Sequence, residues 1–251
     1  MRLPLKVDGE TGVSTALVLI ISKRDNGKTT LANSLWPELA PKERVILVDP
    51  QGTLAVMSGI ARSPVQPTEE STKEFLEKVL RPAEEAGHGH FLMVDEADRF
   101  MTTRGVVAGQ QGPFFELLNV SRGWGMGTLL ISHGAGVTSK NAMEQADVSF
   151  IGNTTETNAL RYWRSYFGDP HYVDFIRRLP PYHFAVWASS MAPNQFQGVI
   201  TVEDGKLVSV SEAELRERMG ESPAPSEETN EEEDAGAGAL PGDRPTVEDG
   251  P

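Results

Sequence analysis

The chain has 251 residues, of which 39% are hydrophobic, so it holds enough apolar material for the core of one large domain or two small ones. The absence of cysteine excludes a disulfide framework and any thiolate-held metal, and the net charge of −13 argues against a broadly basic surface for nucleic acid. The first residues lack the apolar run of a signal peptide, and the apolar segment 13–21 is about half as long as a bilayer crossing requires, so we expect a soluble protein without direct membrane insertion.

The acidic charge is concentrated near the end of the chain. From Glu221 onward there are ten acidic residues and one basic residue, among many Pro, Gly and Ser residues and almost no large apolar ones. Of the 36 acidic and 23 basic residues, 26 and 22 therefore lie in 1–220, which has a net charge of only −4. A segment of the tail's composition buries too little apolar surface to offset its chain entropy. We predict one domain over 1–220 and a disordered acidic tail over 221–251, which either solubilises the protein or acts as a DNA mimic or docking segment.

Apolar runs alternate with segments of helical period along the domain. Strands are expected at 15–22, 44–50, 90–96, 127–133, 148–153 and 183–188, and helices at 28–36, 68–86, 112–122, 154–167 and 171–179. Several of these strands lack alternation of polar and apolar residues, as parallel strands covered on both faces do. A hairpin turning at Asp204–Gly205 and a short helix capped by Ser211 follow. The sequence therefore predicts an α/β fold with a mostly parallel central sheet covered by helices on both faces, plus a C-terminal β-hairpin and short helix.

The turn after the first strand reads SKRDNGKT, residues 22–29. It follows the phosphate-loop pattern G-x-x-x-x-G-K-[ST], except that Ser22 stands in place of the first glycine. In such a loop, backbone N–H groups and the positive end of the helix dipole converge on an anion. Gly27 lets the backbone approach the phosphates, Lys28 reaches the β- and γ-phosphates, and Thr29 supplies a hydroxyl to Mg²⁺. The residues expected to bind ATP are Ser22, Lys23, Arg24, Asp25, Asn26, Gly27, Lys28, Thr29 and Thr30.

A second motif, FLMVDEAD at 91–98, ends a buried strand with two carboxylates. Open α/β sheets bind their ligands at the carboxyl ends of strands, so this pair is typical of a Walker B element. Asp95 is expected to hold Mg²⁺ through water, and Glu96 to orient and polarise the attacking water. The alternative is that the pair only caps the following helix, and the phosphate loop upstream weakens that alternative.

Together with VDPQG at 48–52 and NVSRGWGMGTLLISH at 119–133, these motifs resemble, in their order, the landmarks of the HerA/FtsK superfamily of hexameric DNA-pumping ATPases over about residues 20–190. The resemblance implies a RecA-like (ASCE) P-loop NTPase fold, ATP and Mg²⁺ as ligands, double-stranded DNA as partner, and a homo-oligomeric ring, in that family a hexamer. It also implies a polar sensor, commonly Gln, at the end of the strand between the phosphate-loop and Walker B strands. Here that strand ends in Ser132 and His133, and His133 is either this sensor or a buried, hydrogen-bonded histidine.

The resemblance further implies an arginine that enters the site of a neighbouring subunit. Arg122 is the candidate, with Arg161 and Arg164 as alternatives on one helical face, although Arg122 could equally close a Gly-rich turn at the surface. The Gly- and Gln-rich segment 99–113 is either a pore-facing loop in which Arg104 contacts DNA or an ordinary mobile loop.

Within the superfamily, the short chain most resembles the genome-packaging ATPases of tailless, membrane-containing icosahedral viruses. This implies an ATP-hydrolysing translocase of double-stranded DNA that docks on a viral capsid or membrane vertex protein, in the host cytoplasm or the virion. Two alternatives are a DNA-independent phage morphogenesis or regulatory ATPase of the zonular-occludens-toxin type and a HerA-like cellular DNA-processing ATPase. A third is a nucleotide-binding scaffold without turnover, which Ser22 keeps open.

Overall fold

The computed structural model describes residues 5, 7–50, 61–63, 70, 74, 77, 78, 81, 85, 89–100, 121–135, 140–188 and 195–220. The strands are β1 Leu17–Ile21, β2 Val45–Val48, β3 Ala61–Ser63, β4 Phe91–Val94, β5 Gly127–Ser132, β6 Val148–Gly152, β7 Phe184–Ala188, β8 Gln195–Glu203 and β9 Lys206–Val210. The α-helices are α1 Lys28–Leu35, α4 Ala97–Phe100, α6 Lys140–Gln145, α7 Thr157–Phe167, α8 Pro170–Arg178 and α9 Glu212–Arg218. The 3₁₀ helices are η1 Trp36–Glu38, η2 Lys42–Arg44 and η4 Ser121–Trp124.

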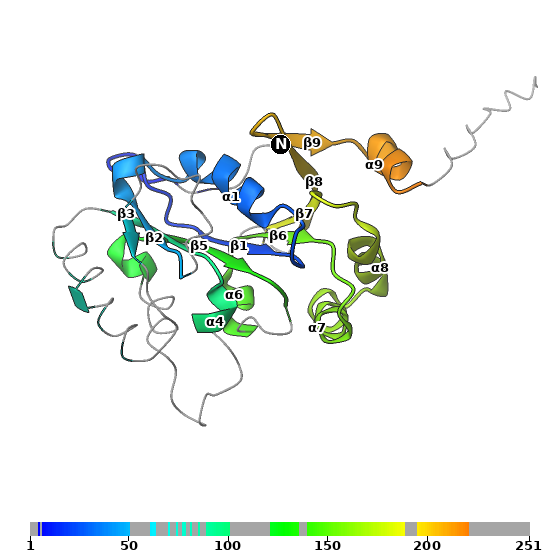
Figure 1. Ribbon diagram of the computed structural model, residues 1–251, viewed down its shortest axis with the longest axis horizontal. Helices are drawn as coiled ribbons and strands as arrows, with labels where there is room; N and C mark the ends of the chain where they lie inside the picture. The colour runs from blue at the N-terminus through cyan, green and yellow to red at the C-terminus, as the bar shows by residue number, and fades with distance from the viewer. Residues whose placement is uncertain are drawn as a thin grey trace, which may run out of the picture.

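All the described strands belong to one sheet, in the order β3-β2-β4-β5-β1-β6-β7-β8-β9. The strands from β3 to β6 in this order are parallel, and β7, β8 and β9 continue the sheet in antiparallel pairs. Strand β1 is central, with β5 on one side and β6 on the other (Figure 1). The predicted α/β fold with a mostly parallel sheet is therefore confirmed.

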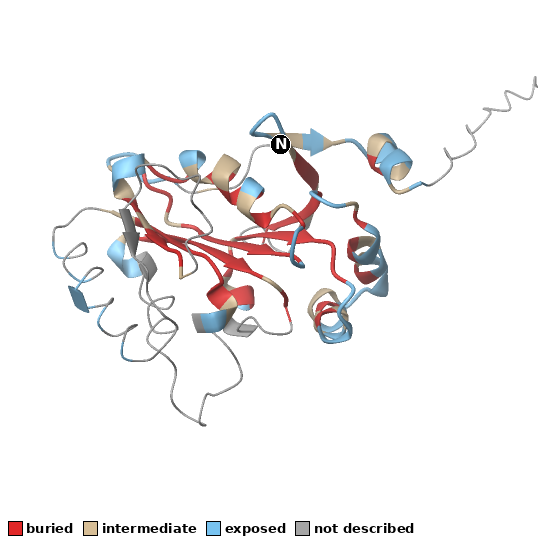
Figure 2. Cartoon of the chain, in the orientation of Figure 1, coloured by how far each residue is buried: buried red, intermediate tan, exposed pale blue. Residues whose placement is uncertain are grey.

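Helices cover both faces of the sheet, which explains why its central strands β1, β4, β5 and β6 are mostly apolar. Helix α1 lies on one face, where Leu31 and Leu35 are buried in the same cluster as Val18 and Ile20 of β1. Helices α4, α6 and α7 lie on the opposite face, and Trp163 of α7 is buried there (Figure 1). Figure 2 shows the central strands of the sheet as the buried middle layer of this arrangement. Because both faces are covered, β1, β4, β5 and β6 are buried at every position.

Three elements have features that the sequence did not specify. Strand β7 was predicted at 183–188 without a direction and is antiparallel to β6, because hydrophobicity records burial and not strand direction. Strand β3 has the sequence ARS and helix α6 the sequence KNAMEQ, and both are too short to give a periodic pattern. The helix expected at 68–86 lies mostly outside the described residues, and so does the helix expected at 112–122, of which only residues 121 and 122 are described, as part of η4.

The C-terminal hairpin and helix have the predicted form. Asp204 and Gly205 both have positive φ, 49° and 73°, which is the backbone of a two-residue type I′ turn between β8 and β9. The Ser211 hydroxyl accepts a hydrogen bond from the backbone N–H of Glu214 at 3.3 Å and so caps α9. Across the described residues, no helix combines the length and the apolar character that crossing a membrane would need.

Candidate active site

The Ser22–Thr29 loop joins the central strand β1 to helix α1. Gly27 caps the helix with a left-handed φ of 80°, and Asp25 has a φ of 58°. A left-handed residue at the cap turns the chain sharply, so that the free N–H groups of the first helical turn lie at the carboxyl end of β1. An anion at this position would meet both those donors and the positive end of the helix dipole.

The residues around Ser22 explain how the loop accommodates a serine in place of glycine. Ser22 is fully buried, and its hydroxyl lies 3.3 Å from the carbonyl oxygen of Asn153 and 2.5 Å from Nδ2 of Asn26, which donates to it. Gly152, at the end of the neighbouring strand β6, makes room for this pair. A Cβ on Gly152 would lie 2.4 Å from the Ser22 hydroxyl oxygen and 2.8 Å from Nδ2 of Asn26. The serine is therefore accepted because the adjacent strand has a glycine beside it.

Lys28 lies at the first position of α1 with only 7% of its surface exposed. Its ammonium group donates a hydrogen bond to the carbonyl oxygen of Lys23 at 2.8 Å, which holds it back over the loop. Burial lowers the pKa of Lys28, and nearby carboxylates, Asp95 first, act in the opposite direction. A bound phosphate would favour the charged form of Lys28 in the same way as these carboxylates.

Asp95 and Glu96 follow β4 directly and are both 7% exposed. The backbone N–H of Asp95 donates to the carbonyl oxygen of Val48 at 2.9 Å, which extends the pairing of β2 with β4 by one bond. Glu96 has a left-handed φ of 53°, which a side chain rarely adopts and which often accompanies a functional position. Since Val48 and Val94 are aligned, Asp49 and Asp95 lie next to one another at the same edge of the sheet.

Both carboxylate oxygens of Glu96 have partners. Oε2 lies 2.5 Å from Nε of Arg99, and Oε1 lies 2.9 Å from Nε2 of His133. A carboxylate accepts hydrogen bonds, so Nε2 of His133 carries the proton, and Nδ1 of the same ring is buried without a hydrogen-bond partner in the part of the chain that is described. The backbone N–H of His133 donates to Oδ1 of Asp98 at 3.3 Å. The His133 side chain is 34% exposed and hydrogen-bonded to Glu96, and its assignment as a sensor or as a buried, hydrogen-bonded histidine stays a prediction.

The sheet order brings these groups together. Strand β5, which ends at Ser132, lies between β1 and β4, as the family resemblance implied for the sensor strand. The phosphate loop, His133 and the two carboxylates thus follow three adjacent strands at their carboxyl ends.

The other predicted site residues have side chains that are exposed, half-buried or outside the described part of the chain. Lys23, Arg24, Asp25 and Thr30 are exposed, and Thr29 is half-buried in the first turn of α1. Arg161 and Arg164 are exposed on α7. Arg122 lies in η4, just before β5, but its side chain is not among those described. Arg104 and the tail from Glu221 lie outside the described residues.

Sequence reasoning missed Tyr182, which lies against the phosphate loop. A Cβ on Gly27 would be 2.4 Å from Cδ1 of the Tyr182 ring. The sequence around it, PPYHF at 180–184, indicates only a turn before a strand, and nothing in it identifies which loop the tyrosine contacts.

The oxygen donors of the site suit Mg²⁺. Thr29 offers a hydroxyl in the first turn of α1, and Asp95 offers a carboxylate directly after β4, at the same edge of the sheet as the end of β1. Mg²⁺ is commonly held by one or two such protein oxygens, with phosphate oxygens and water completing its coordination.

Comparison with known proteins gives a likeness of structure. No protein-family model matches the sequence, and no curated protein matches it. The structure is similar to that of the genome packaging NTPase B204 from Sulfolobus turreted icosahedral virus 2 in complex with AMPPCP, with 18% identity, a TM-score of 0.58, and coverage of 72% of this chain and 96% of that one. It is also similar to B204, the DNA-packaging ATPase from Sulfolobus turreted icosahedral virus, with 19% identity, a TM-score of 0.59 and the same coverage. A complex of the first protein with ATP-γS gives 19% identity and a TM-score of 0.56, over 72% of this chain and 95% of that one. The described chain therefore has the fold of these viral packaging NTPases.

Proposed function

We propose that this protein binds and hydrolyses ATP at the Ser22–Thr29 loop, and that it uses the reaction to move double-stranded DNA during viral genome packaging. One observation carries the proposal: a buried lysine begins a helix directly after a left-handed glycine, at the same edge of the sheet as the two buried carboxylates that follow β4. A buried cation is unfavourable without an anion near it, and phosphate is the anion that such a loop at a helix N-terminus binds. The fold shared with the packaging NTPases supports this assignment.

In the proposed reaction each group has one task. Lys28 and the backbone N–H groups of the loop would bind the phosphates of ATP, and Thr29 and Asp95 would hold Mg²⁺, which would supply positive charge against the phosphate oxygens. Glu96 accepts a proton from the water that attacks the γ-phosphorus, while the bond from that phosphorus to its bridging oxygen breaks. Because both oxygens of Glu96 are engaged in the structure, nucleotide binding must exchange the contact with Arg99 or His133 for this water.

Coupling to DNA requires more than one subunit. The 26 acidic and 22 basic residues of 1–220 give this part of the chain a net charge of −4, so DNA contact depends on a few basic groups repeated around a ring, for which Arg104 is the candidate. Arg122 is the candidate for the arginine that stabilises the transition state in the neighbouring subunit. The ring would then dock on a viral capsid or membrane vertex protein.

The binding step is tested by Lys28→Ala. Isothermal titration with ATP and Mg²⁺ should show no binding by this variant at concentrations that saturate the wild type, because the phosphates lose their buried cation. Lys42→Ala removes an exposed lysine of η2 and is the matched control, expected to bind normally. Wild-type affinity in Lys28→Ala would reject the phosphate-loop assignment.

A further inference from the structure

Tyr182 combines exposure with an unusual backbone. It is one of three large hydrophobic side chains exposed in the described residues, with 52% of its surface accessible, and the others are Val7 and Trp124. Its φ is 63°, a left-handed value at which a bulky aromatic residue is an outlier. Such a conformation persists only where surrounding contacts impose it, and it is concentrated at ligand sites.

The contacts that impose it come from the C-terminal hairpin and helix α9. The hydroxyl of Thr201 on β8 donates to the carbonyl oxygen of Tyr182 at 3.1 Å. Nδ1 of His183 lies 2.8 Å from the carbonyl oxygen of Pro181, which can only accept, so Nδ1 carries the proton and Nε2 is free to accept. Nε2 lies 2.9 Å from Nη1 of Arg218, which donates to it.

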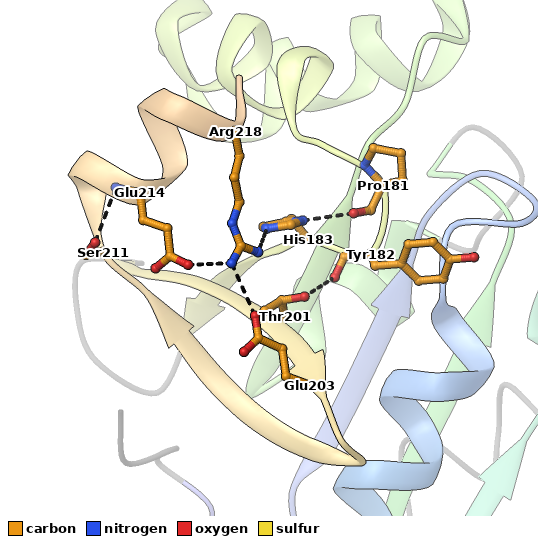
Figure 3. A network of polar contacts seen from close by, with 8 residues as sticks. All are labelled: Pro181, Tyr182, His183, Thr201, Glu203, Ser211, Glu214 and Arg218. Atoms are coloured by element: carbon orange, nitrogen blue, oxygen red, sulfur yellow. Dashed lines mark hydrogen bonds and ion pairs between the residues drawn. The ribbon is translucent and has the colours of Figure 1, made fainter. Parts of the chain in front are cut away.

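Arg218 is itself fixed by two carboxylates. Its second terminal nitrogen lies 3.2 Å from Oε1 of Glu203 on β8 and also pairs with Glu214, one turn earlier on α9. Figure 3 shows this network behind the Pro181–His183 turn, with the Tyr182 ring pointing away from it toward helix α1. The hairpin and α9 therefore hold the backbone of the turn and leave the ring exposed.

The ring is held against the phosphate loop. The built Cβ on Gly27 would lie 2.4, 3.1 and 3.3 Å from three carbons of the Tyr182 ring, so only a glycine leaves space for the ring there. One face of the loop at the start of α1 is thus lined by an aromatic ring.

The position of Tyr182 relative to β1 indicates which part of a nucleotide it would meet. The carboxylates coupled to Lys28 follow β4, which is separated from β1 by β5. Tyr182 precedes β7, which is separated from β1 by β6 on the opposite side. If the terminal phosphates of ATP lie between Lys28 and those carboxylates, the nucleoside extends away from them, toward the side on which Tyr182 lies.

We propose that Tyr182 is the platform on which the adenine base of ATP stacks, and that Arg218 and His183 are positioning residues that hold this platform in place. The proposal rests on the proposed binding of ATP at the phosphate loop. It gives the C-terminal hairpin and α9 a function in nucleotide recognition, because they fix the turn that presents the ring. Aromatic stacking accepts any flat base, so it adds affinity for the nucleoside without any contact to the phosphates.

The test compares ATP with inorganic tripolyphosphate, which has the phosphates but no base. In titration calorimetry with Mg²⁺, Tyr182→Ala should bind ATP roughly 5- to 100-fold more weakly than the wild type and bind tripolyphosphate equally well. Tyr182→Phe should retain ATP affinity, since it keeps the ring. Tyr182→Gly suits the left-handed backbone and should give the same result as Tyr182→Ala if the latter folds poorly.

The outcomes separate this inference from the proposed function. If Lys28→Ala still binds both ligands, the phosphate-loop assignment is wrong. The stacking role is overturned if Lys28→Ala loses both ligands but Tyr182→Ala binds ATP at least as tightly as the wild type. Tighter binding of ATP by Tyr182→Ala would indicate that the ring covers the site instead.

The positioning role has its own variant. Arg218→Ala should weaken ATP binding severalfold while leaving tripolyphosphate unaffected, because the turn loses its support but the phosphate loop does not. Arg216→Ala on the same helix, which removes the pair with Glu212, is the matched control and should bind both ligands normally. Equal losses for ATP and tripolyphosphate in Arg218→Ala, or no loss for either, would contradict the positioning role.

Discussion

Ser22 occupies a position at which phosphate loops usually carry glycine, and two neighbouring residues, Asn26 and Gly152, accommodate its side chain. Asn26 donates to its hydroxyl, and Gly152 faces both side chains from the adjacent strand. The space that a glycine in the loop would leave is provided here by Gly152 on β6. This arrangement favours a functional loop over a degenerate one, because the buried Ser22 hydroxyl has two hydrogen-bond partners, Asn26 and the Asn153 carbonyl oxygen.

Gly152→Ala tests this packing directly. The added methyl group would lie within 2.8 Å of Ser22 and Asn26, so we expect the free energy of unfolding to fall by about 1–3 kcal/mol in urea titrations. Adding Ser22→Gly should restore most of the loss, since the closest contacts are with the serine. A double variant no more stable than Gly152→Ala alone would show that the strain lies elsewhere.

Some residues of the candidate site could be predicted from the sequence, and others could not. Lys28, Asp95 and Glu96 were predicted as site residues because each belongs to a short motif that follows an apolar strand, and the sheet brings these motifs to one edge, while their roles stay predictions. The contact of Glu96 with His133 was not predictable, since it depends on which strands are neighbours. Tyr182 was not predictable either, because its contact with Gly27 joins residues far apart in sequence and involves no recognised motif.

At the scale of secondary structure, helix α7 contributes aromatic side chains to a cluster beneath the sheet. Trp163 stacks on Phe167 with ring centroids 5.4 Å apart, and Phe167 lies 4.5 Å from Trp187 of β7 by the same measure. Tyr162 and Tyr166 stack on the same helix at 5.9 Å. Burial raises the pKa of both tyrosines, and the hydroxyl of Tyr162 is buried with no hydrogen-bond partner among the described residues.

Tyr162→Phe should therefore stabilise the protein by about 1 kcal/mol near neutral pH, because it removes a buried, unpaired hydroxyl. The raised pKa means that the folded state keeps the proton more strongly than the unfolded state, whose tyrosines titrate near pH 10. The titration of Tyr162 therefore does not change the free energy of unfolding below about pH 10. Above that pH the unfolded state releases this proton while the folded state keeps it, so the wild type loses stability. Urea unfolding at about pH 8 and about pH 11 should show a smaller alkaline loss in Tyr162→Phe than in the wild type. A variant less stable than the wild type at the lower pH would contradict this account of the hydroxyl.

Element type was easier to predict than element direction. The hairpin of β8 and β9 followed from Asp204–Gly205, since few residue pairs adopt positive φ at both positions of a turn. The antiparallel direction of β7 did not follow, because a buried strand has the same apolar composition in either direction. Helix α6 has only six residues, fewer than two helical turns, so no period could indicate it.

At the scale of the whole molecule, charge is distributed unevenly along the chain. Residues 221–251 hold ten of the 36 acidic residues, and without them the net charge rises from −13 to −4. The composition of this segment predicts that it adds nothing to the core. Truncation after Gly220 should thus leave the thermal midpoint unchanged and the ATPase rate without DNA within about twofold. A large loss of either would show that the tail is part of the folded ATPase.

The proposed movement of double-stranded DNA requires ATP hydrolysis that responds to DNA. We would therefore measure steady-state ATP hydrolysis with and without double-stranded DNA, with Glu96→Gln as the blank. We predict turnover that DNA stimulates severalfold and that falls roughly 10²- to 10⁴-fold in Glu96→Gln, while ATP binding by that variant persists. ATP turnover by the wild type that does not respond to DNA would contradict the translocase function and favour a morphogenesis or regulatory ATPase. Unimpaired hydrolysis by Glu96→Gln would contradict the catalytic role of Glu96.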